Sequence, residues 1–398
     1  MKTQITGFGC VCSLGDNISE IRQNLFKPVS EISFLDRFES SFAGDYPVFQ
    51  VSQKILSQKD ETESYSFLFL KTALDEALKN ADLRPEDLKG ARVGAVIGTS
   101  VDASFNCFDF YKEWRAGETV SSLDPFNKYV HYSAAKEVLN YLGAADGISQ
   151  TVVTACAAGT DAAGIAAEWI ENSICDVVIA GGTDELNLIP FTGFIKLMIA
   201  SKERSRPFDE NRNGINLGEG AGVLIMESAE FAAGRNAKKA GFVLGYGNIC
   251  DGYHQTSPEP SGKGMKKAVE IALNQSGLKT GDIAFVNAHA TGTEDNDSAE
   301  SAALNEVLNG VPVTATKSKT GHALGAAGAI EACLTLICLN EQKIPAAENF
   351  QTADKKLNLI PVLKDTKITG GKAAVSDSLG FGGCNAALVL AGREYDPA

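Results

Sequence analysis

The 398-residue chain lacks an excess of basic residues, and this absence excludes one class of function. It holds 36 Lys and Arg against 50 Asp and Glu, a formal net charge of −14 at pH 7. Surfaces that bind nucleic acid usually carry a basic stripe, so we expect no nucleic-acid partner. Hydrophobic residues make up 44% of the chain and charged residues 22%, which is typical of a globular protein of one large or two ordinary domains.

Two further absences bear on the compartment. No run of about 18 consecutive apolar residues is evident, so we expect no membrane-spanning helix. The start, Met1 to Gly9, is typical of a first strand and turn and lacks the apolar core of a signal peptide. The cysteines form no Cys-x-x-Cys pair and lie at positions 10, 12, 107, 156, 175, 250, 333, 338 and 384. An odd number of dispersed cysteines favours reduced thiols in a cytoplasmic protein. Because no histidine lies beside Cys10 and Cys12, we expect no zinc site there.

Short apolar segments alternate with segments of helical periodicity. The strand-like segments are 93–99, 151–155 and 175–182, and the helical ones are 66–81, 134–142 and 157–171. We expect the strands to be buried on both faces. The alternation predicts an α/β fold in which helices cover sheets on both sides.

An internal repeat suggests two related halves. Residues 218–226 and 380–390 each combine a glycine-rich turn with a following apolar strand, and a strand at 284–288 precedes a loop and a helix. We place the join near Gly241, after a basic, Ala-rich helix over 229–240. No linker composition separates the halves, so we expect them to pack as one body. The predicted units are residues 1–240 and 241–398.

Cys156 is the strongest candidate for a reactive residue. The β-branched stretch before it stops abruptly, and small residues follow it, which predicts a strand turning sharply into a helix. Free N–H groups and the helix dipole at such a position stabilise a thiolate. The alanines and glycine after Cys156 leave room for a substrate.

Two of the four histidines follow strand-like runs. His289 ends the run 284–289, and His322 lies in the segment 316–331 after a short strand at 313–316. Active sites of α/β folds collect at strand ends. Together with Cys156 these residues favour a cysteine–histidine acyl-transfer site. We interpret His131 and His254 as structural.

Four motifs resemble those of β-ketoacyl-acyl-carrier-protein synthases of the elongating Cys-His-His class. They are Thr154-Ala-Cys156, His289-x-Thr291-x-Thr293 through Asp297, Lys317-Ser-x-Thr-Gly-His322 and Gly380-Phe-Gly-Gly383. Their order and spacing match the family over essentially the whole chain. The resemblance implies the thiolase fold, a duplicated five-layered α/β/α/β/α body, which agrees with the internal repeat.

The resemblance also implies a reaction. Cys156 would hold the acyl chain as a thioester, and the backbone N–H groups of Cys156 and Phe381 would form an oxyanion hole worth about 3 kcal/mol per donor. His289 and His322 would donate hydrogen bonds to the carbonyl of a malonyl thioester while CO₂ leaves and an enolate forms. The enolate would attack the acyl-cysteine, giving a 3-ketoacyl thioester without a metal or redox cofactor.

The remaining site residues are also implied by the family pattern. Lys317 and Glu331 would lie beside the histidines, where a cation keeps an imidazole neutral. Phe381 would be a gate, and the flanking Gly382 would let it move. Asp297 would order the loop behind His289. The threonines expected to bind the phosphopantetheine arm are Thr256, Thr291 and Thr293.

Three departures from the family pattern affect specificity and partners. Ala290 replaces a common glycine, so we expect the loop backbone to differ slightly. Leu379 and Cys384 alter the walls beside the gate, so the preferred acyl chain stays open. An acidic segment at 60–63 stands where the family commonly has part of a basic patch for the acidic acyl carrier protein. Either Lys202, Arg204 and Arg206 dock the carrier, or a partner subunit supplies part of the surface.

Several alternatives stay open at this point. The resemblance implies a homodimer, whereas a paired synthase-like subunit would suit a specialised polyene or polyketide pathway. A thiolase would condense without releasing CO₂, and it usually has a second reactive cysteine near the C-terminus, a region that here contains Cys384. Initiating and chalcone-type synthases resemble Cys-His-Asn sites, which the second histidine argues against. An inactive synthase-like partner subunit would generally lack the nucleophile.

Overall fold

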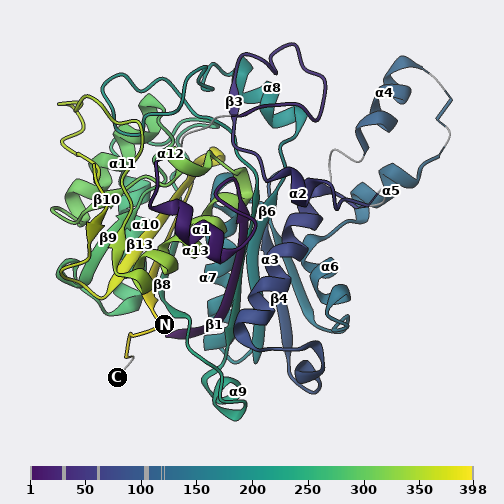
Figure 1. Ribbon diagram of the computed structural model, residues 1–398, viewed down its shortest axis with the longest axis horizontal. Coiled ribbons are helices and arrows are strands. Elements are labelled where there is room, and N and C mark those ends of the chain that lie inside the picture. Colours follow the sequence, from purple (N-terminus) through teal and green to yellow (C-terminus); the bar gives the residue numbers. More distant parts are fainter. Residues whose placement is uncertain are drawn as a thin grey trace.

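One ten-stranded sheet forms the core of the computed structural model, which describes residues 2–28, 33–60, 63–102, 107–117, 119–120 and 122–396 (Figure 1). The strand order is β10-β9-β13-β14-β8-β1-β7-β6-β4-β5. These strands are β1 (Thr3–Cys12), β4 (Val93–Gly98), β5 (Ile148–Val152), β6 (Val177–Asp184), β7 (Gly220–Glu227), β8 (Gly241–Cys250), β9 (Ile283–Asn287), β10 (Val313–Thr314), β13 (Ala373–Gly380) and β14 (Cys384–Gly392). Two small sheets pair β2 (Ser33–Phe34) with β3 (Pro47–Val48), and β11 (Lys343–Ile344) with β12 (Thr366–Lys367).

The helices lie between the strands, and several begin at side chains that accept a backbone N–H. Ser64, Ser133 and Asn187 cap α3, α6 and α8 in this way. The helices are α1 (Ile18–Leu25), α2 (Gln53–Leu56), α3 (Tyr65–Ala81), α4 (Phe108–Ala116), α5 (Asp124–His131), α6 (Ala134–Tyr141), α7 (Ala158–Glu171), α8 (Leu188–Lys196), α9 (Ala229–Gly234), α10 (Lys263–Ser276), α11 (Glu294–Val307), α12 (Lys317–Thr320) and α13 (Ala327–Glu341).

The sheet consists of two halves with the same topology. The halves are β1-β7-β6-β4-β5 and β8-β14-β13-β9-β10. When the strands of each half are numbered 1 to 5 along the chain, both halves read 1-5-4-2-3 across the sheet. In each half two neighbouring pairs of strands are parallel and two are antiparallel, so that β7 and β14 each run opposite to the other four strands of their half. The predicted duplication is therefore confirmed. The halves meet where β1 pairs with β8, and the division into residues 1–240 and 241–398 stays a prediction.

The helices complete five layers. Helices α7 and α13 contact each other and strands of both halves, so they form the central layer. Helix α3 covers β1, β7 and β6 on one outer face, and α10 covers β8 and β14 on the other. The two central helices approach closely because small residues face each other. A Cβ at Gly328 would lie 2.1 Å from the Thr160 hydroxyl oxygen.

One central-layer segment is more apolar than the sequence prediction about membrane spans allowed for. Among the described residues, the helical stretch Leu324–Glu341 is long and apolar enough to cross a membrane by composition, with a mean hydropathy of 1.4. Glu331 interrupts its apolar run, which is why the sequence did not reveal it. The stretch is 89% buried inside the protein, as expected for the core helix of a five-layered body.

Two predicted elements have different boundaries. The strand expected over 151–155 is β5, which ends at Val152 and forms an edge of the sheet with Ile148 exposed. It is therefore not buried on both faces in the single chain. The helix expected over 229–240 ends at Gly234, because the chain turns before β8. Helices α4 and α5 project from the body beyond this edge (Figure 1).

Candidate active site

The Cys156 thiol lies at a sharp turn between β5 and α7. We call the short 3-10 turn Ala155–Ala157 the N-terminal elbow. Ala155 has φ +50°, a left-handed conformation that costs energy for a residue with a Cβ. The turn brings the thiol to the start of the helix and to the wall of a cavity of about 430 Å³.

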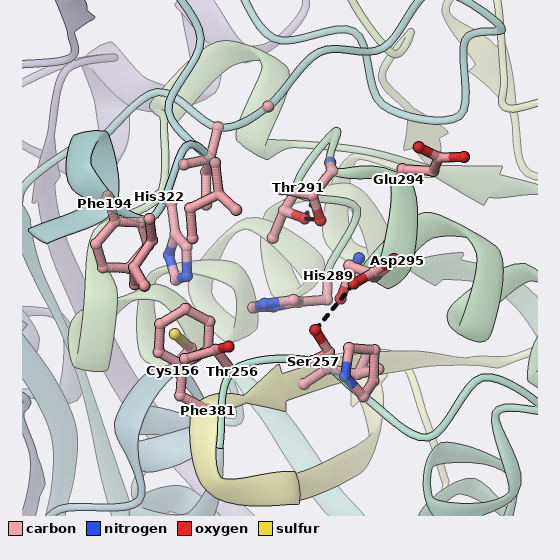
Figure 2. A pocket seen from close by; sticks show the side chains of 18 of the residues that line it. Cys156, Phe194, Thr256, Ser257, His289, Thr291, Glu294, Asp295, His322 and Phe381 are labelled. Atoms are coloured by element: carbon pink, nitrogen blue, oxygen red, sulfur yellow. Dashed lines mark hydrogen bonds between the residues drawn. The ribbon is translucent and has the colours of Figure 1, made fainter. Parts of the chain in front are cut away.

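Both histidines converge on this thiol from the C-terminal half. His289 follows β9, and His322 follows α12. One ligand atom from each imidazole and the Cys156 Sγ all lie within 4.8 Å of one another. The two rings stand at 89° with their centroids 5.2 Å apart. Figure 2 shows the imidazoles and the sulfur facing one space. An oxygen in this space can accept hydrogen bonds from both rings.

Hydrogen bonds on the far side of each ring set its tautomer. The backbone N–H of Leu324 donates to His322 Nδ1 at 3.2 Å, and Lys317 Nζ lies 3.0 Å from His289 Nδ1. Each neutral ring therefore carries its hydrogen on Nε2. Burial, with the positive charge of Lys317, lowers the pKa of both histidines well below the ordinary value. Both are neutral Nε2–H donors.

Lys317 forms a buried ion pair with Glu331, both side chains being 2% exposed. Burial raises the pKa of Glu331 to about 7, and the Lys317 ammonium acts in the opposite direction. The pair therefore keeps a positive charge behind His289 without leaving it uncompensated.

The pKa of Cys156 contradicts the sequence expectation of a stabilised thiolate. Burial raises it to about 11, although Lys317 and the backbone N–H of Phe381 act to lower it. Desolvation of the charged sulfur outweighs the favourable charges around it. The resting nucleophile is a thiol, so its proton must leave during acyl transfer.

Cys156, His289 and His322 are also residue types that bind metal ions. Their atoms are close enough to ligate an ion. However, both Nε2 atoms carry hydrogen, and the Lys317 ammonium next to His289 disfavours a second cation. The donor set therefore does not fit a resident metal, and the expectation of a metal-free site stays a prediction.

The threonines predicted to bind phosphopantetheine all line the cavity. The hydroxyls of Thr291 and Thr293 lie 2.9 Å apart. Thr256 enters from the loop after β8, and its hydroxyl lies 3.4 Å from His254 Nδ1. These hydroxyl groups give the cavity a polar wall.

Asp297 lies beneath this wall and is fully buried. Its carboxylate accepts backbone N–H groups from Phe208 at 2.7 Å and Gly292 at 3.1 Å. The geometry supports the expected role in ordering the loop. Ala290, in place of the family glycine, has φ +41°, so the loop has kept a glycine-like backbone despite the Cβ.

Phe381 lines the cavity beside Cys156 (Figure 2). Its ring stacks on Phe194 of α8, with centroids 5.5 Å apart and an angle of 13° between the planes. Phe194 also meets the His322 ring edge-on at 6.4 Å. Gly382 follows with φ +82°, a conformation that glycine adopts without strain. The sequence offered no pattern that linked α8 to this loop, so Phe194 was missed.

The three residues expected to dock the carrier lie outside the cavity lining and have partners within the chain. Lys202 pairs with Asp45 at 3.2 Å, and Arg206 with Glu203 at 2.5 Å. Arg204 donates to the Ser318 carbonyl at 3.4 Å. Neighbouring carboxylates thus offset the charges of Lys202 and Arg206, and the docking role stays a prediction. Of the acidic segment at 60–63, only Asp60 and Glu63 are among the described residues.

Two buried acids behind His289 were also missed. The His289 backbone N–H faces Glu300 Oε1 at 2.6 Å and Asp377 Oδ1 at 2.8 Å. Burial raises the pKa of both carboxyls, and their mutual repulsion adds to this for Glu300. Asp377 could have been suspected, because an acid in the middle of an apolar strand needs a buried partner.

Comparisons with known proteins agree with this site. Residues 2–232 match the β-ketoacyl synthase N-terminal domain, and residues 240–351 match the β-ketoacyl synthase C-terminal domain. A 3-oxoacyl-[acyl-carrier-protein] synthase 2 of Synechocystis sp. is 32% identical, covering 99% of this chain and 98% of the relative. One from Staphylococcus aureus is 31% identical, covering 98% of each.

Solved structures show the same fold. The ishigamide ketosynthase/chain length factor has a TM-score of 0.92 at 28% identity, covering 99% of both chains. A type II polyketide acyl carrier protein complex with its ketosynthase, bound to the hexaketide, gives 0.89 at 27% identity over 98% of this chain and 99% of that one.

The fold and the converging thiol and imidazoles define a condensing enzyme of the acyltransferase class. The chain belongs to the β-ketoacyl synthase family.

Proposed function

We propose that the protein is a ketosynthase that condenses an acyl group held on Cys156 with a malonyl group carried by acyl carrier protein. One observation carries this proposal: a thiol and two neutral Nε2–H donors lie within 4.8 Å of one another beside a cavity with a polar wall. That arrangement suits a reaction in which negative charge develops on a carbonyl oxygen.

In the loading step, the Cys156 sulfur attacks the carbonyl carbon of an acyl thioester. The oxyanion would be held by the backbone N–H groups of Cys156 and Phe381, which already favour the charged form of the sulfur. The C–S bond to the carrier then breaks, and the carrier thiolate takes the proton that the Cys156 thiol gives up. The acyl group ends on Cys156.

In the extension step, the malonyl thioester oxygen lies between the Nε2–H groups of His289 and His322. The bond to the carboxylate breaks, CO₂ leaves, and the electron pair forms an enolate held by both donors. The enolate carbon attacks the acyl carbon on Cys156, and the cysteine leaves as the thiolate, which takes up a proton from solvent to restore the thiol. The product is a 3-ketoacyl thioester two carbons longer.

We infer that the partners are an acyl carrier protein and a second condensing-enzyme subunit. Structural relatives include a ketosynthase in complex with its carrier protein and a ketosynthase/chain length factor. The exposed edge strand β5 and the projecting α4 and α5 offer a surface for such a subunit. A homodimer and a heterodimer both use this edge in our proposal. We place the reaction in the cytoplasm, where thiols stay reduced.

A thiolase reaction is less well supported. Thiolase chemistry needs a second cysteine at the reacting centre, and the candidate is Cys384. Among the described residues that line the cavity, Cys156 is the only cysteine. The two histidine donors also suit decarboxylation, which a thiolase does not perform.

Intact-protein mass spectrometry tests the proposal directly. The full chain is exposed to carrier proteins loaded with different acyl groups, and we expect an added acyl mass that maps to Cys156. Addition of malonyl carrier should then release CO₂ and remove that mass. Absence of loading by every acyl carrier would refute the function, and condensation without CO₂ release would support the thiolase alternative.

The gate is tested by Gly382→Val, which replaces a glycine at φ +82° with a β-branched residue. The open space around this position excludes a simple clash, since nothing lies within 4 Å of an added Cβ. We expect extension to slow more than acyl loading in single-turnover assays. Equal slowing of both steps would contradict a gating role for Phe381.

A further inference from the structure

Two cysteines outside the cavity lining face each other across the strands that hold the gate. Cys250 ends β8, Cys384 begins β14, and the two are register partners in this antiparallel pair. Beside them, the Asp251 N–H donates to the Gly383 carbonyl at 2.9 Å. This hydrogen bond joins the residues flanking the cysteines, so the cysteines occupy a non-hydrogen-bonded position of the ladder.

That position suits a disulfide. Residues opposite each other at a non-hydrogen-bonded position have Cα atoms about 4.5 Å apart, with side chains on the same face. Disulfides need Cα separations of about 4.4–6.8 Å. Cys250 and Cys384 therefore meet the backbone requirement without a change of register.

The two thiols differ in access. Cys250 is exposed, whereas Cys384 is half-buried and packs against the hydrophobic core. Burial and nearby negative charge from Asp161 raise the pKa of Cys384. A dissolved reagent therefore reaches Cys250 first, and Cys384 is placed to attack from beneath.

The pair is coupled to the gate loop by direct contacts. The Cys250 thiol donates to the Gly382 carbonyl at 3.4 Å. The Gly382 N–H donates to the Gln255 carbonyl at 2.8 Å, in the loop that follows Cys250. These bonds join Gly382, the residue that follows Phe381, to the end of β8 and to the loop after it.

We propose that Cys250 and Cys384 form a reversible disulfide that fastens the ends of β8 and β14 and restrains the Phe381 gate. The disulfide itself rests on the strand register, whereas its effect on activity rests on the proposed ketosynthase function. Cys384 is one of the departures from the family's last motif, so this device belongs to the particular sequence of this chain.

The chemistry balances with a low-molecular-weight disulfide such as oxidised glutathione. The Cys250 thiolate attacks one glutathione sulfur, forms a mixed disulfide and releases one glutathione. The Cys384 thiolate then attacks the Cys250 sulfur and releases the second glutathione. Two protein thiols are oxidised, one glutathione disulfide is reduced, and the two protons pass to the departing thiolates.

The test begins with the reduced full-length protein and oxidised glutathione, followed by blocking of free thiols and peptide mapping. We expect a linked peptide pair containing Cys250 and Cys384, a loss of two hydrogen atoms from the intact mass, and full reversal by dithiothreitol. Cys250→Ser and Cys384→Thr should abolish the link. Cys107→Ser, which removes a partly exposed thiol at the N-cap of α4, is the matched control and should leave the link unchanged.

The functional effect is measured on the same samples in single-turnover assays. We expect extension to slow by about tenfold, equivalent to about 1.4 kcal/mol in the barrier, with loading of Cys156 nearly unchanged. A stable glutathione adduct on Cys250 alone, or a link from either residue to Cys156, would overturn the proposal. If the disulfide forms but the rates of loading and extension stay unchanged, its proposed effect on the gate is wrong. Failure of the reduced protein to accept an acyl group would instead refute the proposed ketosynthase function. The two outcomes are distinguishable, because the loss of two hydrogen atoms that reports the disulfide needs no enzymatic activity.

Discussion

The two halves of the molecule repeat one structural device, but only one copy carries a reactive side chain. In the N-terminal elbow, Ala155 with φ +50° precedes Cys156. The corresponding 3-10 turn, Leu324–Ala326, leads into α13 and begins at φ +52°. We call it the C-terminal elbow. The residue equivalent to Cys156 in it is Gly325.

Packing explains why the C-terminal elbow has no nucleophile. The Gly325 N–H donates to a carboxylate oxygen of Asp184 at 2.6 Å, and an added Cβ would lie 2.5 Å from the Thr99 carbonyl carbon. The N-terminal elbow instead borders an open cavity. Duplication preserved the strained backbone in both halves, and the neighbouring segments decided which copy has room for a side chain.

The loops after the equivalent strands β4 and β9 carry different residues. After β9 the C-terminal half places His289 at the cavity. After β4 the N-terminal half places Thr99, whose hydroxyl donates to Asp184 at 2.7 Å and takes no part in the cavity lining. One half thus supplies the nucleophile and the other supplies the two hydrogen-bond donors, and neither half contains a complete site.

Replacing Cys156 by glycine, the residue at the equivalent position of the C-terminal elbow, should remove activity and leave the fold intact. We expect Cys156→Gly to lower condensation by about 10⁴-fold or more, since no acyl-enzyme forms. Steady-state condensation and acyl loading by mass spectrometry measure the effect, and circular dichroism serves as the control for folding. Retained acyl loading in this variant would place the nucleophile elsewhere.

Adding a side chain to the C-terminal elbow should damage stability. We expect Gly325→Ala to lower the free energy of unfolding by about 1–3 kcal/mol, because the new Cβ would press on the backbone at Thr99. Denaturant unfolding measures the change. Gly234→Ala, at a position with nothing within 4 Å of an added Cβ, is the matched control and should be neutral. Equal stability of the two variants would contradict the packing explanation.

The N-terminal elbow should titrate as a buried thiol. The pKa of Cys156 is raised to about 11, so its thiolate fraction at neutral pH is small and increases with pH. Inactivation by iodoacetamide should accelerate by about tenfold per pH unit between about pH 7 and pH 9. Cys156→Ala corrects for alkylation of other thiols. A plateau in the rate below about pH 8 would mean that the helix dipole outweighs burial.

The donors of the C-terminal half should depend on the charge of Lys317. Loss of this ammonium removes a cause of the lowered pKa of His289, so that pKa should rise. Because Lys317→Met alone would leave Glu331 buried and unpaired, the variant to measure is Lys317→Met with Glu331→Gln. Histidine titration by NMR against the wild type gives the direction of the shift. An unchanged pKa would assign the lowering to burial and to the neighbouring His322.

Much of the fold followed from the sequence because its causes are local. Alternating apolar and amphipathic segments predicted the α/β layers, and the glycine-turn-strand repeat predicted the duplication. Where contacts distant in sequence decide, the prediction was wrong or absent. The strand β5 proved to be an edge strand, and Phe194 of α8 stacks on Phe381. Neither fact has a pattern within its own segment.

The sequence by itself determined which residues are present at the site and in which order, because the motifs around Cys156, His289, Lys317 and His322 are short and contiguous. Only the tertiary structure decided their chemical state. The pKa of Cys156 and the tautomers of both histidines depend on burial and on groups from distant segments. A charge is stabilised or penalised by everything packed around it, and that environment exists only once the two halves have come together.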